Sequence, residues 1–273
     1  MDGRQEFEAN LARLDSGDAE GLLRCALLLS QDENPNINVE ACVKRIDDIA
    51  RMVTVGSHAG PAEQAEAINT VLFQTLGFHG TEENYYHARN NFLDYVLEVR
   101  EGIPISMCLL YVEVGRRAGV RLAGIGLPGH VVVQVGSGEL FVDPFHRGVL
   151  LNRQGVERLT GNFLSEGERF MAEWLEPLTP RSFLARLLRN LKAAYAQGFD
   201  MPRLAWVCDR LVRVLPDDLV ERRDRGLVLF SQKRYGLAAA DLEYYLHRLT
   251  DEEERVPLEE LYRKARQFQA LMN

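Results

Sequence analysis

The sequence predicts an α+β domain followed by an all-α domain, on three observations. The stretch Arg100–Phe145 has the pattern of one buried helix followed by a two-stranded hairpin. From Arg181 onward every periodic segment has helical spacing, and part of that region repeats with the 34-residue period of a tetratricopeptide repeat. We therefore expect a first domain over residues 1–176 and a tetratricopeptide-like helical domain over residues 181–273.

The chain before this central stretch is expected to be helical. Apolar residues recur at helical spacing over residues 4–14, 18–30, 39–55 and 62–76, with Gly77 suited to a helix end. A dense group of hydrogen-bonding side chains then precedes a short helix over residues 92–99; the group comprises Tyr85, Tyr86, His87, Arg89, Asn90 and Asn91. We interpret it as a structured loop in which Asn90 or Asn91 caps the helix. The alternative is that it forms a wall of a cleft near Cys108.

The central helix should lie inside the protein. Pro104 fits a first-turn position, where a missing N–H is harmless, and residues 105–114 are apolar on most of the circumference. Arg116 and Arg117 fall where cations favour the helix dipole, and Gly119 suits the helix end.

The hairpin brings a histidine near an aspartate in most of its short-loop registers. Its strands are His130–Val135 and Leu140–Asp143, which are rich in β-branched and aromatic residues. A two-residue loop, for which Gly136-Ser137 suits a type II′ turn, places His130 opposite Asp143. A four-residue loop places Asp143 opposite Val132, diagonal to His130 on the same face, whereas a three-residue loop separates the two side chains.

Further segments complete the expected order of elements. We expect a short strand at Val149–Leu151, a helix at Gly167–Trp174 and a linker at Leu175–Pro180. Five helices follow over residues 182–195, 202–215, 219–230, 235–249 and 257–271. The repeat signal rests on Gly226, Tyr235, Ala238 and Leu242, which match the small, aromatic and apolar positions of a tetratricopeptide repeat.

Composition excludes several classes of protein. Hydrophobic residues are 46% and charged residues 26% of the 273, which is ordinary for a soluble globular chain. A net charge of −8 argues against binding nucleic acid by phosphate neutralisation. No apolar run reaches the roughly 18 residues of a membrane span, and the N-terminus lacks the apolar core of a signal peptide. We therefore expect a cytoplasmic protein that binds neither membrane nor nucleic acid.

The four cysteines have no metal-type or disulfide-type spacing. Cys25, Cys42 and Cys208 sit in helical apolar patterns and are expected to fill the core as free thiols. A metal site from His130, Asp143 and His146, with His79 or His87, has no helix or strand spacing to support it. We expect no metal and no cofactor.

Cys108, His130 and Asp143 are the candidate catalytic residues. In this chain order they supply a thiol nucleophile, an imidazole base and a carboxylate that orients the base. Burial in the middle of a helix would instead make the thiol inert. Likewise, His130 and Asp143 could lock the hairpin without any reaction. Ser106 is a further candidate hydroxyl, and its structural alternative is a hydrogen bond returned to the helix backbone.

These residues give the chain a resemblance to bacterial transglutaminase-like proteins with a C-terminal tetratricopeptide region, the SirB-type regulatory proteins. The resemblance covers about Val39 to Leu249. Its most specific parts are Arg100-Glu-Gly-Ile-Pro-Ile, Pro128-Gly129-His130 and Asp143-Pro144-Phe145. It implies a papain-like core, in which a cysteine-bearing helix packs on an antiparallel sheet that supplies histidine and aspartate. It also places the usual cysteine at the start of the central helix, where this sequence has Pro104.

Two hypotheses follow. In the first, the protein is a non-catalytic or weakly catalytic scaffold that binds a protein or peptide partner in a regulatory role. The alternative is a cysteine-dependent amide hydrolase or acyl-transferase that uses Cys108, His130 and Asp143. The repeat region carries an acidic, aromatic segment that suits a basic or apolar peptide, comprising Tyr244, Tyr245 and residues 251–254. The sequence identifies neither the substrate nor the oligomeric state.

Overall fold

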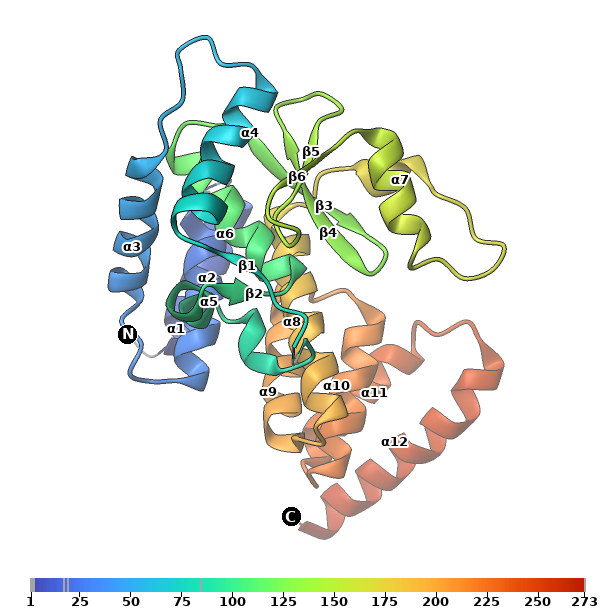
Figure 1. The fold of residues 1–273 in the computed structure, drawn as a ribbon. Coiled ribbons are helices and arrows are strands. Elements are labelled where there is room, and N and C mark those ends of the chain that lie inside the picture. The colour runs from blue at the N-terminus through green and yellow to red at the C-terminus, as the bar shows by residue number, and fades with distance from the viewer. Residues whose placement is uncertain (1–2, 17, 19, 84, 273) are drawn as a thin grey trace. The chain divides into compact units, whose positions relative to one another are not determined.

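The computed structural model describes residues 3–16, 18, 20–83 and 85–272, and divides the chain into two compact units (Figure 1). The first unit is Met1–Leu187 and the second is Leu188–Asn273, so the boundary falls within helix α8 (Pro180–Gln197). The first unit contains helices and a small sheet, and the described part of the second contains helices only, in agreement with the predicted α+β and all-α parts.

Helices make up the first part of the first unit. They are α1 (Gly3–Asp15), α2 (Glu20–Glu33), α3 (Val39–Met52) and α4 (Pro61–Asn69), which continues as a π-helical turn at Thr70–Thr75. The four predicted helical segments are thus confirmed. A cluster of ion pairs connects α2 and α3 to the helix Pro104–Arg117. In it, Arg117 pairs with Glu20 of α2, with Asp47 of α3 and with the buried carboxylate of Glu113 in the same helix as Arg117.

Helix α6 (Pro104–Arg117) is the buried centre of the first unit. All of its residues from Pro104 to Tyr111 are buried, as the nearly continuous apolar pattern predicted. Pro104 occupies the first helical turn, and Gly119 has a left-handed φ of 79° just beyond the end. The Tyr111 hydroxyl donates to the Ala65 carbonyl, which joins α6 to α4.

The sheet packed against α6 has four antiparallel strands in sequential order. They are β3 (Leu122–Leu127), β4 (His130–Val135), β5 (Phe141–Asp143) and β6 (Val149–Leu151). The predicted hairpin and short strand are confirmed, but the two-stranded description missed β3. The glycines of β3 weaken its strand signal. They leave space for other side chains, since the Phe183 ring packs against Gly124 and the Leu178 side chain packs against Gly126.

The β4–β5 register corresponds to the four-residue loop. Val133 pairs with Val142 and Gln134 with Phe141, and the Val135 N–H donates to the Leu140 carbonyl. The two-residue type II′ turn is therefore wrong. This register puts Asp143 opposite Val132 and diagonal to His130 on the same face of the sheet.

One expectation after the sheet is also wrong. The predicted helix at Gly167–Trp174 is irregular apart from a 3₁₀ turn at Ala172–Leu175, and the helix of this region is α7 (Arg153–Gly161). Asn152 caps α7 by accepting the Gly155 N–H. The segment predicted as a linker is an irregular connection between this 3₁₀ turn and α8, and within it the Leu178 N–H donates to the Gly124 carbonyl.

The second unit is a series of helices at the five predicted places, although the fourth ends at Leu246 instead of residue 249 and the fifth begins at Glu252 instead of residue 257. After α8 come α9 (Met201–Val214), α10 (Leu219–Ser231), α11 (Tyr235–Leu246) and α12 (Glu252–Met272). Gly226 of α10 lies against the Leu242 side chain of α11, so the small residue of the repeat pattern allows these helices to approach closely. Leu242, Tyr245, Leu246 and Leu258 form a buried cluster that joins α11 to α12.

Candidate functional site

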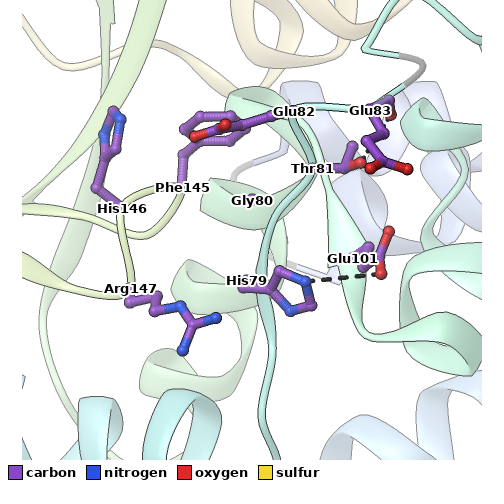
Figure 2. A pocket seen from close by; sticks show the side chains of 9 residues that line it. All are labelled: His79, Gly80, Thr81, Glu82, Glu83, Glu101, Phe145, His146 and Arg147. Atoms are coloured by element: carbon purple, nitrogen blue, oxygen red, sulfur yellow. Dashed lines mark hydrogen bonds and ion pairs between the residues drawn. The ribbon is translucent and has the colours of Figure 1, made fainter.

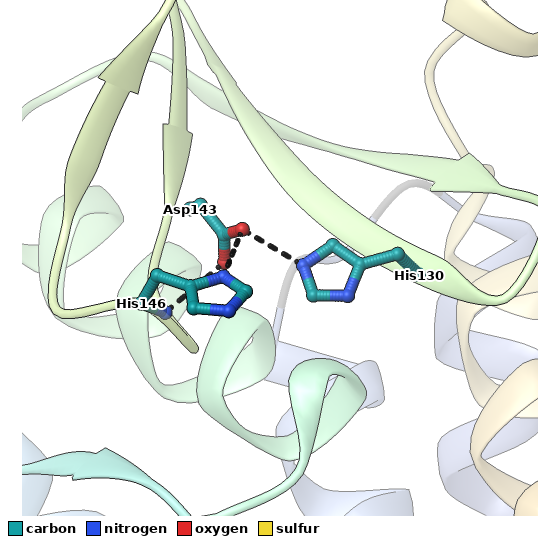
Figure 3. Close-up of side chains that lie close together, drawn as sticks. All are labelled: His130, Asp143 and His146. Carbon is teal, nitrogen blue, oxygen red and sulfur yellow. Dashed lines mark hydrogen bonds and ion pairs between the residues drawn. The ribbon is translucent and has the colours of Figure 1, made fainter. Parts of the chain in front are cut away.

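His130 and Asp143 form a buried hydrogen-bonded pair on one face of the sheet (Figure 3). The distance from His130 Nε2 to Asp143 Oδ2 is 2.9 Å, and both side chains are about 3% exposed. The diagonal relation of the two positions in the four-residue-loop register lets the side chains meet. Burial raises the pKa of Asp143, but the hydrogen bonds from His130 and His146 outweigh this effect and hold it below its usual value.

The turn after β5 adds a second imidazole to this pair. His146 Nδ1 lies 2.7 Å from the same Oδ2 atom, and the backbone N–H groups of Phe145 and His146 donate to Oδ1. Arg147 and Gly148 both have left-handed φ values, 55° and 78°, which bend the chain back toward Asp143. The Asn69 side chain donates to the Gly148 carbonyl and so fixes this turn to α4.

Aromatic rings and one arginine hold His130 in place. Its imidazole meets the Phe145 ring edge to face and stacks with the Phe163 ring, at centroid distances of 5.9 and 6.2 Å. Arg186 of α8 donates to the backbone carbonyls of Leu127 and His130, at the two sides of the β3–β4 turn. The histidine is therefore fixed through both its ring and its backbone.

Cys108 has the environment of a structural thiol. It is completely buried in α6, and its Sγ atom donates to the Val131 carbonyl at 3.2 Å. Burial, with a smaller contribution from the nearby Asp143 charge, raises the pKa of this thiol well above its usual value. A hydrogen bond to His130 is absent from the contacts of the described residues, so sequence order alone does not produce a thiol–imidazole pair here.

The neighbouring polar residues on α6 and before α5 (Leu93–Val99) have structural roles. The Ser106 hydroxyl accepts the Ile103 N–H and donates to the Asn90 carbonyl, which joins the start of α6 to the 3₁₀ turn Ala88–Asn91. The predicted cap of α5 is wrong, because Phe92 takes the cap position without a side-chain hydrogen bond. Asn90 and Asn91 instead donate to the Tyr85 and Ala88 carbonyls.

A pocket of about 650 Å³ borders the His130–Asp143–His146 cluster (Figure 2). It lies between β1 (His79–Gly80), its parallel partner β2 (Glu101–Gly102) and the turn after β5. Its charged lining is mainly acidic, and includes Glu82, Glu83 and Glu101 against the single arginine Arg147. His79 Nε2 lies 3.6 Å from Glu101 Oε1. His146 belongs to both the cluster and the pocket.

The acidic, aromatic segment of the repeat region is largely engaged within its own unit. Tyr245 is buried, and the guanidinium groups of Arg222 and Arg248 both lie over the Tyr244 ring. Glu254 forms an ion pair with Arg223 at 2.6 Å. Asp251, Glu252 and Glu253 are exposed; Glu252 pairs with Arg255, and Asp251 accepts the Glu253 N–H.

The sequence had named His130 and Asp143 as partners but had not placed His146 or the pocket. His79 and His87, which it considered beside them, lie outside the three-residue cluster found among the described residues. The signal for His146 was the Asp143-Pro-Phe-His146-Arg-Gly148 run, whose aspartate and glycine are typical of a tight turn. The pocket joins residues 79–83, Glu101 and residues 145–147, which lie far apart in the chain, and so it carries no local signal.

Comparison with known proteins agrees with this architecture. The family model described as "Transglutaminase-like superfamily" matches residues 40–189, and a "Tetratricopeptide repeat" model matches residues 191–266. No helix among the described residues is both long and apolar enough to cross a membrane.

Relatives match over most of the chain. A UPF0162 protein of Xylella fastidiosa is 35% identical over 87% of this chain and 86% of its own length. A UPF0162 protein of Vibrio cholerae is 28% identical over 84% and 86%. F-box only protein 21 of Mus musculus is 36% identical over 37% of this chain and 18% of its own length. No solved structure matches the chain. The chain is therefore a member of the transglutaminase-like superfamily, similar over most of its length to UPF0162 proteins, with a tetratricopeptide region after the transglutaminase-like part.

Proposed function

We propose that this protein is a non-catalytic transglutaminase-like scaffold that binds a protein or peptide partner in a regulatory role. The observation that carries the proposal is Pro104 in the first turn of α6. The resemblance to transglutaminase-like enzymes implies a cysteine at this position. Proline offers no nucleophile, so the N-terminal field of the helix, which would favour a thiolate, has no thiol to act on.

The surroundings of Cys108 support the same proposal. A thiol must be a thiolate and must reach its substrate in order to attack. Cys108 is completely buried, is bonded to a backbone carbonyl, and has a raised pKa. Each of these properties lowers its reactivity.

The alternative is a cysteine-dependent amide hydrolase or acyl-transferase. Cys108 would attack the carbonyl carbon, His130 would take the thiol proton and later protonate the leaving amine, and Asp143 would fix the imidazole. The 2.9 Å bond between His130 and Asp143 favours this alternative, because it is the geometry of a base and its orienting carboxylate. Such a reaction would require α6 to expose Cys108.

The binding part of the proposal rests on the acidic pocket and on the repeat helices. The pocket between β1, β2 and the turn after β5 is large enough for a side chain or a short peptide segment. Its excess of carboxylates suits a partner with basic residues. Tetratricopeptide helices provide a second surface of the kind used for protein partners.

The experiment that tests the proposal is alkylation of Cys108 by iodoacetamide as a function of pH, read by peptide mass spectrometry. We expect Cys108 to be labelled only after denaturation, whereas the half-buried Cys42 is labelled in the native protein and serves as an internal control. A His130→Ala variant is measured in parallel. Rapid native labelling of Cys108 with an apparent pKa well below about 8.5, lost in that variant, would establish the hydrolase alternative.

A further inference from the structure

The side chains of His130, Asp143 and His146 converge on one point (Figure 3). Taking one ligand atom from each residue, all three atoms lie within 4.8 Å of one another. We propose that these three residues form a binding site for a divalent transition-metal ion of the Zn²⁺ type. The proposal is independent of partner binding, since it concerns the cluster itself.

The charge of Asp143 is the first argument for a cation. Its carboxylate is 2% exposed, and within the described part of the chain it makes no ion pair with lysine or arginine. A buried carboxylate needs a compensating positive charge, because transfer of an isolated ion out of water is costly. In this structure the imidazoles of His130 and His146 form hydrogen bonds to the Asp143 carboxylate. A divalent metal ion bound by the three residues would supply the positive charge that compensates this carboxylate.

The surroundings orient the three side chains as the outer residues of a metal site do. Asp143 Oδ1 accepts the backbone N–H groups of Phe145 and His146, which leaves Oδ2 to face both imidazoles. The Phe145 and Phe163 rings fix the plane of His130. Metal ligands are commonly held by such outer contacts, which reduce the entropy lost when the ion binds.

The two spacings to Asp143 Oδ2 require only a small increase. The ring nitrogens of His130 and His146 are 2.9 and 2.7 Å from Asp143 Oδ2. Ligand atoms around a tetrahedral zinc ion lie about 3.3 Å apart, given bonds of about 2.0 Å. The His146 side chain is 52% exposed on its turn and has room to withdraw by this amount. His146 also lines the acidic pocket, so the three-residue cluster borders that pocket.

The ligand set indicates the class of ion. Two imidazoles and one carboxylate suit Zn²⁺ and other first-row transition metals, whereas Ca²⁺ and Mg²⁺ prefer oxygen ligands. Three protein ligands with one position open is the arrangement of a zinc site that also binds a water or a ligand group. The sequence offers these three residues without a spacing that supports a metal site, and the fold brings them together.

Isothermal titration of the metal-free full-length protein with Zn²⁺ tests the proposal, with Co²⁺ absorption as a second readout of the ligand geometry. We expect one ion per chain. Loss of an outer contact typically weakens a metal site 10- to 100-fold, so His146→Ala, which removes a ligand, should weaken binding by about 100-fold or more. Asp143→Asn, which keeps an oxygen for the turn N–H groups, should also weaken it strongly.

His58→Ala is the matched control, since His58 is an exposed histidine outside the cluster. It should bind Zn²⁺ like the unmodified protein, and circular dichroism should show that all variants remain folded. Absence of stoichiometric Zn²⁺ binding would overturn the proposal. Binding that persists unchanged in His146→Ala would overturn it as well, because the ion would then be held by other groups.

Discussion

Two segments of the candidate site approach each other closely at Gly80 and Phe145. The Gly80 N–H donates to the Phe145 carbonyl at 3.0 Å, and a Cβ atom at Gly80 would overlap both that carbonyl oxygen and the Phe145 ring. Phe145 in turn packs edge to face on His130. The absence of a side chain at position 80 therefore determines where the ring that supports His130 can lie.

We predict that Gly80→Ala destabilises the protein by about 1–3 kcal/mol, the usual effect of overpacking a close contact. Urea unfolding followed by circular dichroism measures this change. Gly138→Ala is the control, because no atom lies within 4 Å of a Cβ at that position and its φ is not left-handed. An equal loss of stability in both variants would show that the effect comes from glycine replacement in general.

Single residues differ in how well the sequence predicts their roles. His130 and Asp143 were paired correctly, because alternation along a strand restricts which side chains share a face. His146 was named beside them only for a metal site that no spacing supports, since its place depends on two consecutive left-handed residues, Arg147 and Gly148. Sequence statistics allow left-handed glycine but seldom anticipate a left-handed arginine.

At the scale of helices, a network of ion pairs links the second half of α8 to α10. The Lys192 ammonium bonds to Glu221 at 2.7 Å and to Asp224, while Arg189 bonds to Glu221 from the other side. Glu221 is 2% exposed. Burial lowers the pKa of Lys192, but the hydrogen bonds to Asp224 and Glu221 outweigh burial and raise it above its usual value.

The direction of this shift predicts the pH dependence of stability. A lysine whose pKa is higher in the folded state stabilises the fold below its unfolded pKa of about 10.4, and that stabilisation is lost as pH rises through the folded value. We expect the free energy of unfolding to fall above about pH 10.4, and this part of the decrease to be absent in Lys192→Met. At neutral pH that variant should be less stable by about 1–3 kcal/mol, since Glu221 loses a charged partner.

Denaturant titrations at several pH values measure both effects. Lys264→Met is the control, because Lys264 forms an exposed pair with Glu260 and should change stability little. An alkaline decrease that is identical in the unmodified protein and in Lys192→Met would assign it to other groups.

Elements with one strong period were predicted well, and elements that depend on distant contacts were not. The apolar circumference of α6 and the spacing of the five C-terminal helices located these helices correctly, because amphipathic periodicity is local, but the start of α12 was placed five residues too late. Strand β3 was missed because it contains Gly124 and Gly126, and glycine has a low strand propensity. These glycines leave room for side chains of α8 and for Leu178, which the sequence pattern does not reveal. The register of β4 and β5 was limited to alternatives, and tertiary packing selected the four-residue loop.

For the whole molecule, the distribution of charge points to the kind of partner. The chain has 32 basic and 40 acidic residues and a net charge of −8. The pocket beside the histidine cluster concentrates this charge in Glu82, Glu83 and Glu101. A cleft lined by one sign of charge raises the local concentration of oppositely charged ligands and speeds their association. Partner selection by this protein should therefore depend both on total charge and on where the charge lies.

Two variants with the same net charge separate the effect of total charge from the effect of charge in the pocket. Glu82, Glu83 and Glu101 are changed to glutamine in one variant, and the exposed Glu166, Glu173 and Glu176 in the other, so both have a net charge of −8 + 3 = −5. The probe is a short fluorescein-labelled peptide of alternating lysine and alanine, with a glutamate–alanine peptide for comparison, measured by fluorescence polarisation at low salt.

We expect the lysine peptide to bind the unmodified protein and the glutamate peptide to fail. The pocket variant should weaken lysine-peptide binding about tenfold, since each exposed charge contact contributes about 0.2–1 kcal/mol. The control variant should weaken it less, and added salt should weaken binding in every case because screening shortens the reach of the charges. If both variants weaken binding equally, peptide binding depends on the net charge of the chain, and the proposal that the pocket is the partner site is wrong.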